Sequence, residues 1–270
     1  MADDDLSDFQ RTTFTHEGKT REIFRLGSGP AVIVIAEMPG ITPKVLDFAR
    51  KVAGIGCTAV LPHLFGTPGR DPNVGRGAAL AYMGSSMVPA CISREFTVLA
   101  TGKTSPVVDW LRALARAEHA RCGGPGVGAV GMCFTGGYAL AMATDDIMLA
   151  PVLSQPSMPV GLTARARRNI DISPGDLDVV KGRCARGLNV LGMRFTSDKL
   201  VPAERFEFLR EQLGDAFIAV ELDDVDANPN AAFPPHSVLT EHLIDAPGER
   251  TRAALDQVLE LFRTQLLSAG

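Results

Sequence analysis

One cysteine lies where the sequence changes abruptly from a buried strand to a helix. Residues 127–140 read VGAVGMCFTGGYAL, with Cys133 at the junction. Small residues flank it, as a sharp strand-to-helix turn requires, because such a turn packs closely against neighbouring backbone. The start of a helix also favours the thiolate, which is the nucleophilic form of cysteine. The pattern predicts that Cys133 is a nucleophile; the alternative is a small buried residue in an ordinary turn.

A thiol nucleophile needs a base, usually histidine, and an acid that orients the base. In a sheet with such a turn, the chain order is nucleophile, acid, histidine. Asp198 follows a predicted late strand, and His236 and His242 are the two histidines after Cys133. We predict that Asp198 and His236 complete the set. His242, expected on a short helix, is the alternative base.

Two backbone N–H groups are candidates to bind a developing oxyanion. The N–H of Phe134 directly follows the nucleophile, and the loop after an early strand supplies a second donor in such sheets. That loop contains Glu37 and Met38, so we expect the second donor to be the N–H of Met38. Glu37 lies at the carboxyl end of a strand, where ligands bind in open α/β sheets. We expect its carboxylate to take the thiol's proton; the alternative is an exposed loop glutamate.

These residues need a framework of alternating strands and helices. Residues 31–36 form a continuous apolar run, typical of a strand buried on both faces. The alternation predicts a mostly parallel sheet with helices on both faces. A hairpin is expected at 9–16 and 20–26, and further strands at 31–36, 57–61, 126–131, 147–153, 188–195 and 216–222. Helices are expected at 43–53, 106–119, 134–144, 174–186, 203–213 and 249–267. Thr42 is expected to cap the first of these helices and Ser173 the fourth.

No change in composition divides the chain, so we expect one α/β domain over residues 1–270. The segment 66–105 is rich in Gly and Ser and interrupts the alternation. We expect a loop insertion there. Insertions of this kind often cover active sites, and a peripheral loop is the alternative.

Charge and composition exclude several classes of function. The chain has 27 basic and 31 acidic side chains, so its net charge of −4 offers no electrostatic basis for binding nucleic acid. The start MADDDLSDFQ lacks the basic and apolar regions of a signal peptide. No apolar stretch is long enough to span a membrane. The 5 cysteines lack C-x-x-C spacing, which favours a reduced, cytoplasmic protein without a zinc site.

Taken in order, these motifs resemble the dienelactone hydrolase family of the α/β-hydrolase superfamily. The resemblance covers roughly residues 10–267. It rests on AEMPG at 36–40, LPHLF at 61–65, GMCFTGG at 131–137, Asp198 with Val201–Pro202, and His236–Ser237. It implies the α/β-hydrolase fold, with a mostly parallel central sheet and helices on both faces.

The resemblance also implies an activity. Cys133, His236 and Asp198 match a Cys–His–Asp triad that cleaves an ester or enol lactone through a thioester intermediate. The family acts without a metal or other cofactor on cyclic enol lactones such as 4-carboxymethylenebut-2-en-4-olide, and its members are mainly cytoplasmic. The expected partner is a small-molecule ester or lactone, and the expected assembly is a monomer or small homo-oligomer.

Three further positions match the family. Glu37 matches a glutamate that contacts the thiol and helps activate it when substrate binds, and the N–H groups of Met38 and Phe134 match the oxyanion hole. Two positions depart from the family pattern: Thr135 replaces a glycine two residues after the nucleophile, and Thr240 replaces a carboxylate-binding arginine four residues after the histidine. The first predicts an altered elbow. The second predicts a substrate without the same carboxylate, or with a different anchor.

Other interpretations stay open at this point. Arg94 is a weak candidate for a second family arginine that binds the substrate carboxylate. The departures at Thr135 and Thr240 also suit a non-catalytic ligand-binding protein or pseudo-enzyme, whose thiol would have ordinary reactivity. A redox sensor with Cys122 as the resolving thiol is disfavoured, because Cys122 precedes the strand that Cys133 follows, which places the sulfurs far apart.

Overall fold

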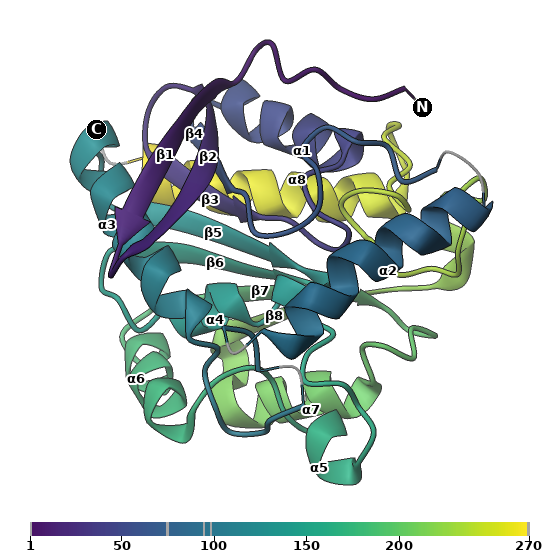
Figure 1. The fold of residues 1–270 in the computed structure, drawn as a ribbon. Coiled ribbons are helices and arrows are strands. Elements are labelled where there is room, and N and C mark those ends of the chain that lie inside the picture. The colour runs from purple at the N-terminus through teal and green to yellow at the C-terminus, as the bar shows by residue number, and fades with distance from the viewer. Residues whose placement is uncertain (1, 74–75, 94, 98, 269–270) are drawn as a thin grey trace.

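The computed structural model describes residues 2–73, 76–93, 95–97 and 99–268. Eight strands form one sheet in the order β1-β2-β4-β3-β5-β6-β7-β8 (Figure 1). The pairs β1–β2 and β2–β4 are antiparallel, and the others are parallel, as the sequence predicted. The strands are β1 Gln10–His16, β2 Lys19–Gly27, β3 Ala31–Ile35, β4 Thr58–Pro62, β5 Val127–Met132, β6 Met148–Ser154, β7 Val190–Phe195 and β8 Phe217–Leu222.

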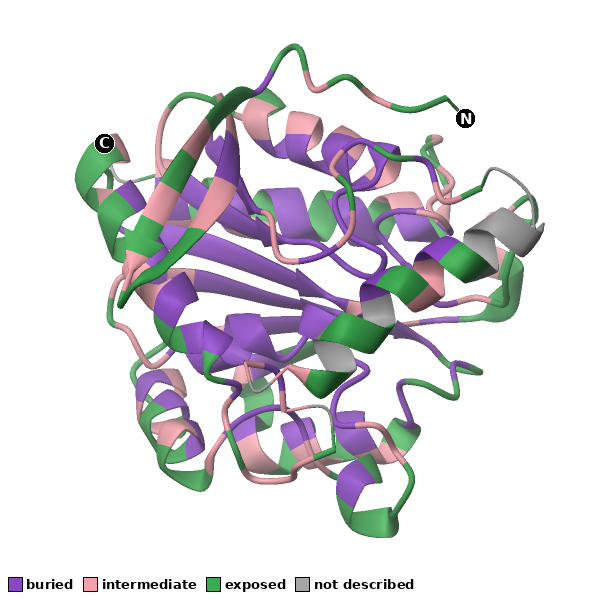
Figure 2. Ribbon diagram, viewed as in Figure 1, coloured by how far each residue is buried: buried purple, intermediate pink, exposed green. Residues whose placement is uncertain are grey.

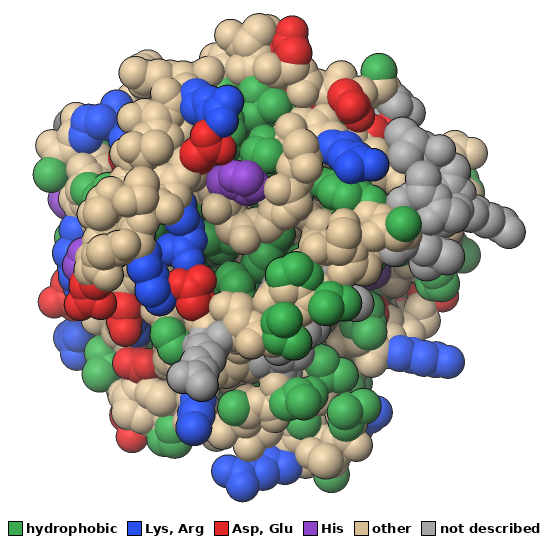
Figure 3. Space-filling view, in the orientation of Figure 1, with side chains coloured by type: hydrophobic (Ala, Val, Ile, Leu, Met, Phe, Trp, Pro, Cys, Tyr) green, Lys and Arg blue, Asp and Glu red, His purple; other side chains and the backbone are tan. Residues whose placement is uncertain are grey.

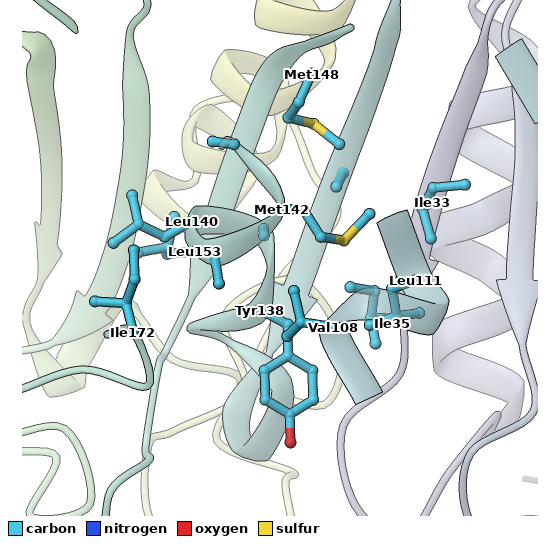
Figure 4. Close-up of a cluster of buried hydrophobic side chains, with 14 of the residues drawn as sticks. Ile33, Ile35, Val108, Leu111, Tyr138, Leu140, Met142, Met148, Leu153 and Ile172 are labelled. Atoms are coloured by element: carbon cyan, nitrogen blue, oxygen red, sulfur yellow. The ribbon is translucent and has the colours of Figure 1, made fainter. Parts of the chain in front are cut away.

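Helices cover both faces of this sheet (Figures 1 and 2). They are α1 Pro43–Gly54, α2 Arg76–Ile92, α3 Val107–Cys122, α4 Tyr138–Met142, α5 Ala164–Arg167, α6 Pro174–Cys184, α7 Ala203–Leu213 and α8 Arg250–Phe262. Successive residues of β3 alternate between two apolar layers. Val32 and Val34 pack with α1 and α8, while Ile33 and Ile35 pack with α3 and α4. Figure 4 shows Ile33 and Ile35 within the second layer, which also contains Tyr138 of α4.

Two helix starts follow from their capping residues. Thr42 Oγ1 accepts a hydrogen bond from the N–H of Val45 at 3.4 Å, and Ser173 Oγ accepts one from Asp176 at 3.1 Å. A proline follows each cap, where its missing N–H removes no helical hydrogen bond. These contacts confirm the predicted starts of α1 and α6. None of the helices in the described part of the chain is both long and apolar enough to cross a membrane.

Two of the predicted helices differ from the prediction in type or length. The helix expected at 134–144 is a 3-10 turn, Cys133–Thr135, followed by the short α4. Gly136, which lies between the two, packs closely, because a Cβ on it would lie 2.4 Å from the Cα of Pro156. The helix expected at 249–267 is α-helical only to Phe262 and continues as a π-helix over Arg263–Leu267.

The segment 66–105, expected as a loop insertion, contains helix α2. Its apolar and small residues form a helix despite the internal Pro89, which the sequence pattern had obscured. Tyr82 anchors it, since the phenol oxygen accepts a hydrogen bond from the N–H of Thr67 at 2.9 Å. After the helix, the ring of Phe96 packs against Phe134 with centroids 5.6 Å apart. The segment therefore lies against the residue that follows Cys133.

Candidate active site

Cys133 adopts a strained backbone conformation at the end of β5. Its φ is 52°, in a region that non-glycine residues rarely occupy and that costs of order 1–3 kcal/mol. Two glycines permit the turn. A Cβ on Gly131 would lie 2.2 Å from the carbonyl oxygen of Thr135, and one on Gly136 would meet Pro156. The local sequence thus builds the sharp elbow that was expected around Cys133.

Thr135, one of the two departures from the family pattern, fits this elbow. It is fully buried, and its Oγ1 accepts a hydrogen bond from the N–H of Met132 at 3.0 Å. The same hydroxyl donates to the carbonyl of Ile35 at 2.9 Å, at the end of β3. The glycines that the close contacts demand are at 131 and 136. Thr135 therefore joins the elbow to the neighbouring strand and leaves the strained turn intact.

Asp198 and His236 are brought into contact from two different loops. Asp198 Oδ2 lies 2.6 Å from Nδ1 of His236, and both side chains are buried. The other carboxylate oxygen accepts the N–H of Leu200 at 2.9 Å, which fixes the acid after β7. This contact places the proton of a neutral imidazole on Nδ1. Nε2 of His236 is buried and makes no hydrogen bond to the described residues.

The charge state of His236 depends on its neighbours. Burial acts to lower the pKa of His236, but the nearby Cys133 and the hydrogen bond with Asp198 outweigh it. The pKa of His236 consequently stands well above its usual value. An imidazolium beside a thiol is the arrangement that favours a thiolate.

His242, the alternative base, makes hydrogen bonds to the backbone of the loop that carries His236. It lies in a turn and not on the short helix expected. Its Nδ1 accepts the backbone N–H groups of Ser237 at 3.1 Å and His236 at 3.4 Å, and its Nε2 donates to the carbonyl of Phe233 at 3.0 Å. Burial lowers the pKa of His242, so the neutral ring that these contacts require is favoured. Both ring nitrogens are thus occupied.

Glu37 is buried at the end of β3, which excludes an exposed loop glutamate. Its Oε2 accepts hydrogen bonds from Gln155 Nε2 at 3.0 Å and from Ser237 Oγ at 2.6 Å. Its Oε1 accepts one from the hydroxyl of Thr240. The carboxylate therefore contacts neutral donors in this state. A hydrogen bond to the Cys133 thiol, which is expected when substrate binds, is not among its contacts in the described part of the chain.

Two site residues were missed in the sequence. Ser157 Oγ lies 3.5 Å from Cys133 Sγ, and the Ser157 N–H donates to the Cys133 carbonyl at 3.0 Å. Gln155, with φ at 35°, bridges Glu37 to the N–H of Val238 beyond the histidine. Both residues lie within three positions of the end of β6, the strand next to β5. A polar run after a buried strand, at the edge where ligands bind, was the available signal.

The two candidate oxyanion donors lie after neighbouring strands. Met38 follows β3, Phe134 follows β5, and these strands pair in parallel. Within the described part of the chain, neither N–H is used in a hydrogen bond. Beside them, the rings of Phe65, Phe96 and Phe134 contact one another with centroids 5.1–5.6 Å apart. Arg94 lies outside the described residues.

Cys122 and Cys133 lie at opposite ends of β5. Cys122 ends α3 before the strand, and Cys133 follows it. A strand of this length spans about 20 Å, far more than a disulfide can bridge. This separation argues against the redox pair.

The sheet order, the helices on both faces and the strained turn after β5 together define the α/β-hydrolase fold. The pattern that defines the dienelactone hydrolase family matches residues 24–180, more than half of the chain. The chain belongs to the dienelactone hydrolase family. A search among curated proteins finds no match.

Solved structures show the same fold. A dienelactone hydrolase-like promiscuous phosphotriesterase from metagenomic libraries is 16% identical, with a TM-score of 0.62 over 96% of this chain and 98% of that one. Dienelactone hydrolase from Anabaena variabilis is 16% identical, with a TM-score of 0.58 over 96% and 99%. The α/β hydrolase GrgF from a Penicillium species is 15% identical, with a TM-score of 0.58 over 96% and 99%. At these identities the likeness concerns the fold alone.

Proposed function

We propose that this protein hydrolyses an ester or enol lactone through a thioester on Cys133. The observation that carries the proposal is the buried Asp198–His236 contact of 2.6 Å. The direction of the His236 pKa, which Cys133 and Asp198 raise, agrees with it. A histidine that is oriented by a carboxylate and adjacent to a cysteine is the arrangement that activates a thiol.

The chemistry proceeds in two stages. The thiolate of Cys133 attacks the carbonyl carbon, and the N–H groups of Met38 and Phe134 stabilise the oxyanion. His236 then gives its proton to the leaving alkoxide or enolate, which leaves an acylated sulfur. In the second stage His236 takes a proton from water, the resulting hydroxide attacks the thioester, and the acid is released. The thiolate and the imidazolium are thereby restored.

The substrate class follows from the nucleophile and from Thr240. Activated esters and enol lactones acylate easily, because their alcohol or enol leaves readily, and they suit a cysteine. Where the family has a carboxylate-binding arginine, the neutral Thr240 contacts Glu37. We therefore propose a substrate that lacks the family substrate's carboxylate or binds it elsewhere. We also propose that the protein acts in the cytoplasm, as a monomer or small homo-oligomer.

A matched pair of cysteine variants tests the proposal. Cys133→Ser and Cys122→Ser are compared with the parent protein on p-nitrophenyl acetate, and quenched reactions are examined by mass spectrometry for an acyl group on the peptide that contains Cys133. We expect Cys133→Ser to lose at least a hundredfold in kcat/KM and Cys122→Ser to lose none. Undiminished ester turnover by Cys133→Ser would contradict the thioester route.

A further inference from the structure

Helix α7, labelled in Figure 1, carries Arg205. Among the described residues, Arg205 is the largest fully buried side chain, with no exposed surface. All five of its recorded hydrogen-bond partners are backbone carbonyl oxygens. Nε donates to Asn169 at 2.7 Å, Nη1 to Pro156 at 2.7 Å and Leu200 at 3.5 Å, and Nη2 to Pro159 at 2.6 Å and Ala166 at 3.2 Å.

This arrangement uses the whole donor capacity of a guanidinium. Arginine has five N–H groups in a planar fork, whereas lysine has three donors on one atom. Burial lowers the pKa of Arg205 to about 10, and the field of Asp198 acts in the opposite direction. The side chain is therefore still a cation at neutral pH. Its burial is costly unless both its donors and its charge have partners.

Two of the five carbonyls belong to segments that touch the proposed triad. Pro156 precedes Ser157, whose Oγ lies 3.5 Å from Cys133 Sγ. Leu200 donates its own N–H to Asp198 Oδ1 at 2.9 Å. Arg205 thus bonds both the segment beside the nucleophile and the turn that carries the acid.

We propose that Arg205 is a positioning residue for the triad. The five N–H donors of its guanidinium fix the position of residues 156–169 relative to the turn that carries Asp198. The positive charge of Arg205 stabilises the ionised carboxylate of Asp198, which orients His236. The inference rests on the proposed thiol chemistry, since it concerns the same Cys133, Asp198 and His236.

The charge and the fork make separate contributions. Loss of the charge raises the proton affinity of every group in its field, so the pH profile of the thiol–imidazole pair moves to higher pH. Among the described residues, the other charged or titratable groups near this pair are Asp198 after β7, which acts on His236, and His242 in the histidine loop, which also lies in the field of Glu37 after β3. These are the same in every variant. Loss of the five-donor geometry with the charge kept misplaces Cys133, Asp198 and His236 but does not move the pH profile of the thiol–imidazole pair.

The variants are Arg205→Lys, which keeps the charge, and Arg205→Gln, which removes it. Arg183→Lys is the matched control, because Arg183 is also buried and donates to four carbonyls, those of Ala143, Asp145, Asp146 and Met148. Those carbonyls precede or begin β6, at the edge of the sheet opposite Cys133. Each variant is measured for thermal unfolding, for kcat and KM on p-nitrophenyl acetate, and for iodoacetamide alkylation of Cys133 against pH.

We expect Arg205→Lys to lower kcat at least tenfold at an unchanged pH profile. Arg205→Gln should move the alkylation profile upward by roughly half a pH unit or more. Arg183→Lys should lose thermal stability while it keeps both kcat and the profile. Folded Arg205 variants with the parent kcat and profile would overturn the proposal. An Arg183→Lys variant that loses kcat as much as Arg205→Lys does would also overturn it, because the loss would then be a general effect of a buried arginine.

A measurement on the parent protein covers the case in which the Arg205 variants do not fold. In protein labelled with ¹⁵N-arginine and assigned through its backbone, alkylation of Cys133 should shift the Nε–H resonance of Arg205 and leave that of Arg183 in place. An unmoved Arg205 resonance contradicts the proposal. If the proposed function is wrong, Cys133 of the parent protein will react like an ordinary free thiol. That result is distinct from a failure of the Arg205 proposal.

Discussion

Ser237 donates a hydrogen bond of 2.6 Å to Oε2 of Glu37, so the residue after the proposed base is tied to the end of β3. Thr240 and Gln155 donate to the same carboxylate. Glu37 is thus the shared acceptor that holds the histidine loop against the sheet. Any movement of Glu37 towards the thiol on substrate binding must first break these contacts.

Thr240→Val removes one of the three donors to Glu37. The loss of a hydrogen bond to a buried carboxylate destabilises the folded state, and we expect the free energy of unfolding to fall by about 1–3 kcal/mol. We also expect kcat on p-nitrophenyl acetate to fall, because the histidine loop loses an anchor. Urea unfolding and steady-state kinetics measure both effects. Thr240→Ser, which keeps the hydroxyl, should restore most of both losses, and equal losses in the two variants would refute this role.

His242 should act through its acceptor nitrogen. His242→Phe leaves the N–H groups of His236 and Ser237 without their acceptor, which predicts a loss of about 1–3 kcal/mol and a lower kcat. His242→Asn places an oxygen near the position of Nδ1 and should retain more of both. The comparison uses urea unfolding and ester hydrolysis. Equal behaviour of the two variants would show that the acceptor does not matter.

The acid sensitivity of the fold should depend in part on the same ring. The pKa of His242 is lowered on folding, so the unfolded chain binds the proton more readily. Its stabilising contribution is therefore complete above the unfolded value, about 6.5, and is lost as the pH falls below it. His236 has a raised pKa and acts in the opposite sense, so its contribution is lost as the pH rises above about 6.5. The difference in unfolding free energy between the parent protein and His242→Asn, followed from pH 7 to 5, isolates the His242 contribution. A difference that does not change with pH would contradict it.

Asp171 predicts a second, opposite pH dependence. Burial raises the pKa of Asp171 to about 6, despite hydrogen bonds from Ser105 and Thr97. The folded state therefore holds the proton more tightly than the unfolded state, whose value is 3.8. The stabilisation is complete below 3.8 and is lost as the pH rises through about 6, a change of order 3 kcal/mol.

The variant Asp171→Asn lacks this titration. Urea unfolding at pH 4 to 7 should show that the parent protein loses more stability than Asp171→Asn over this interval. Subtraction of the two curves removes the groups that titrate in both proteins. Parallel curves would show that Asp171 does not titrate there.

Gly136 should not tolerate a side chain. A Cβ there would lie 2.4 Å from the Cα and 3.0 Å from the N of Pro156, which are backbone atoms and leave little room to relax. Gly136→Ala should therefore lose several kcal/mol of stability, of order 3 or more, and nearly all esterase activity. Gly175, in α6, has nothing within 4 Å of its added Cβ, so Gly175→Ala is the control and should gain up to about 1 kcal/mol. An active, stable Gly136→Ala would mean that the elbow is more open than described.

The sequence predicted much of the fold because its signals there are local. Continuous apolar runs give β3 and β5, and Thr42 and Ser173 with their following prolines start α1 and α6. The proximity of Asp198 and His236 was predictable from chain order, because parallel strands bring their carboxyl ends to one edge of a sheet.

The remaining features depend on contacts between distant parts of the chain. Glu37 meets Gln155, Ser237 and Thr240, which are 118, 200 and 203 residues away, so no local pattern gives the direction of its carboxylate. Arg205 is buried by carbonyls of other segments, which its own helix cannot reveal. Helix α2 was missed because Pro89 and small residues hide its helical pattern.

The central claim is that His236 and Asp198 activate the Cys133 thiol for acyl transfer. The most direct test follows iodoacetamide alkylation of Cys133 against pH, with hydrolysis of p-nitrophenyl acetate measured in the same samples. We predict that alkylation stays fast well below pH 8.5, near which a free thiol ionises, and that turnover is lost in step with alkylation. Slow alkylation with the pH dependence of a free thiol, and turnover that survives it, would contradict the account and favour a non-catalytic binding protein on the same fold.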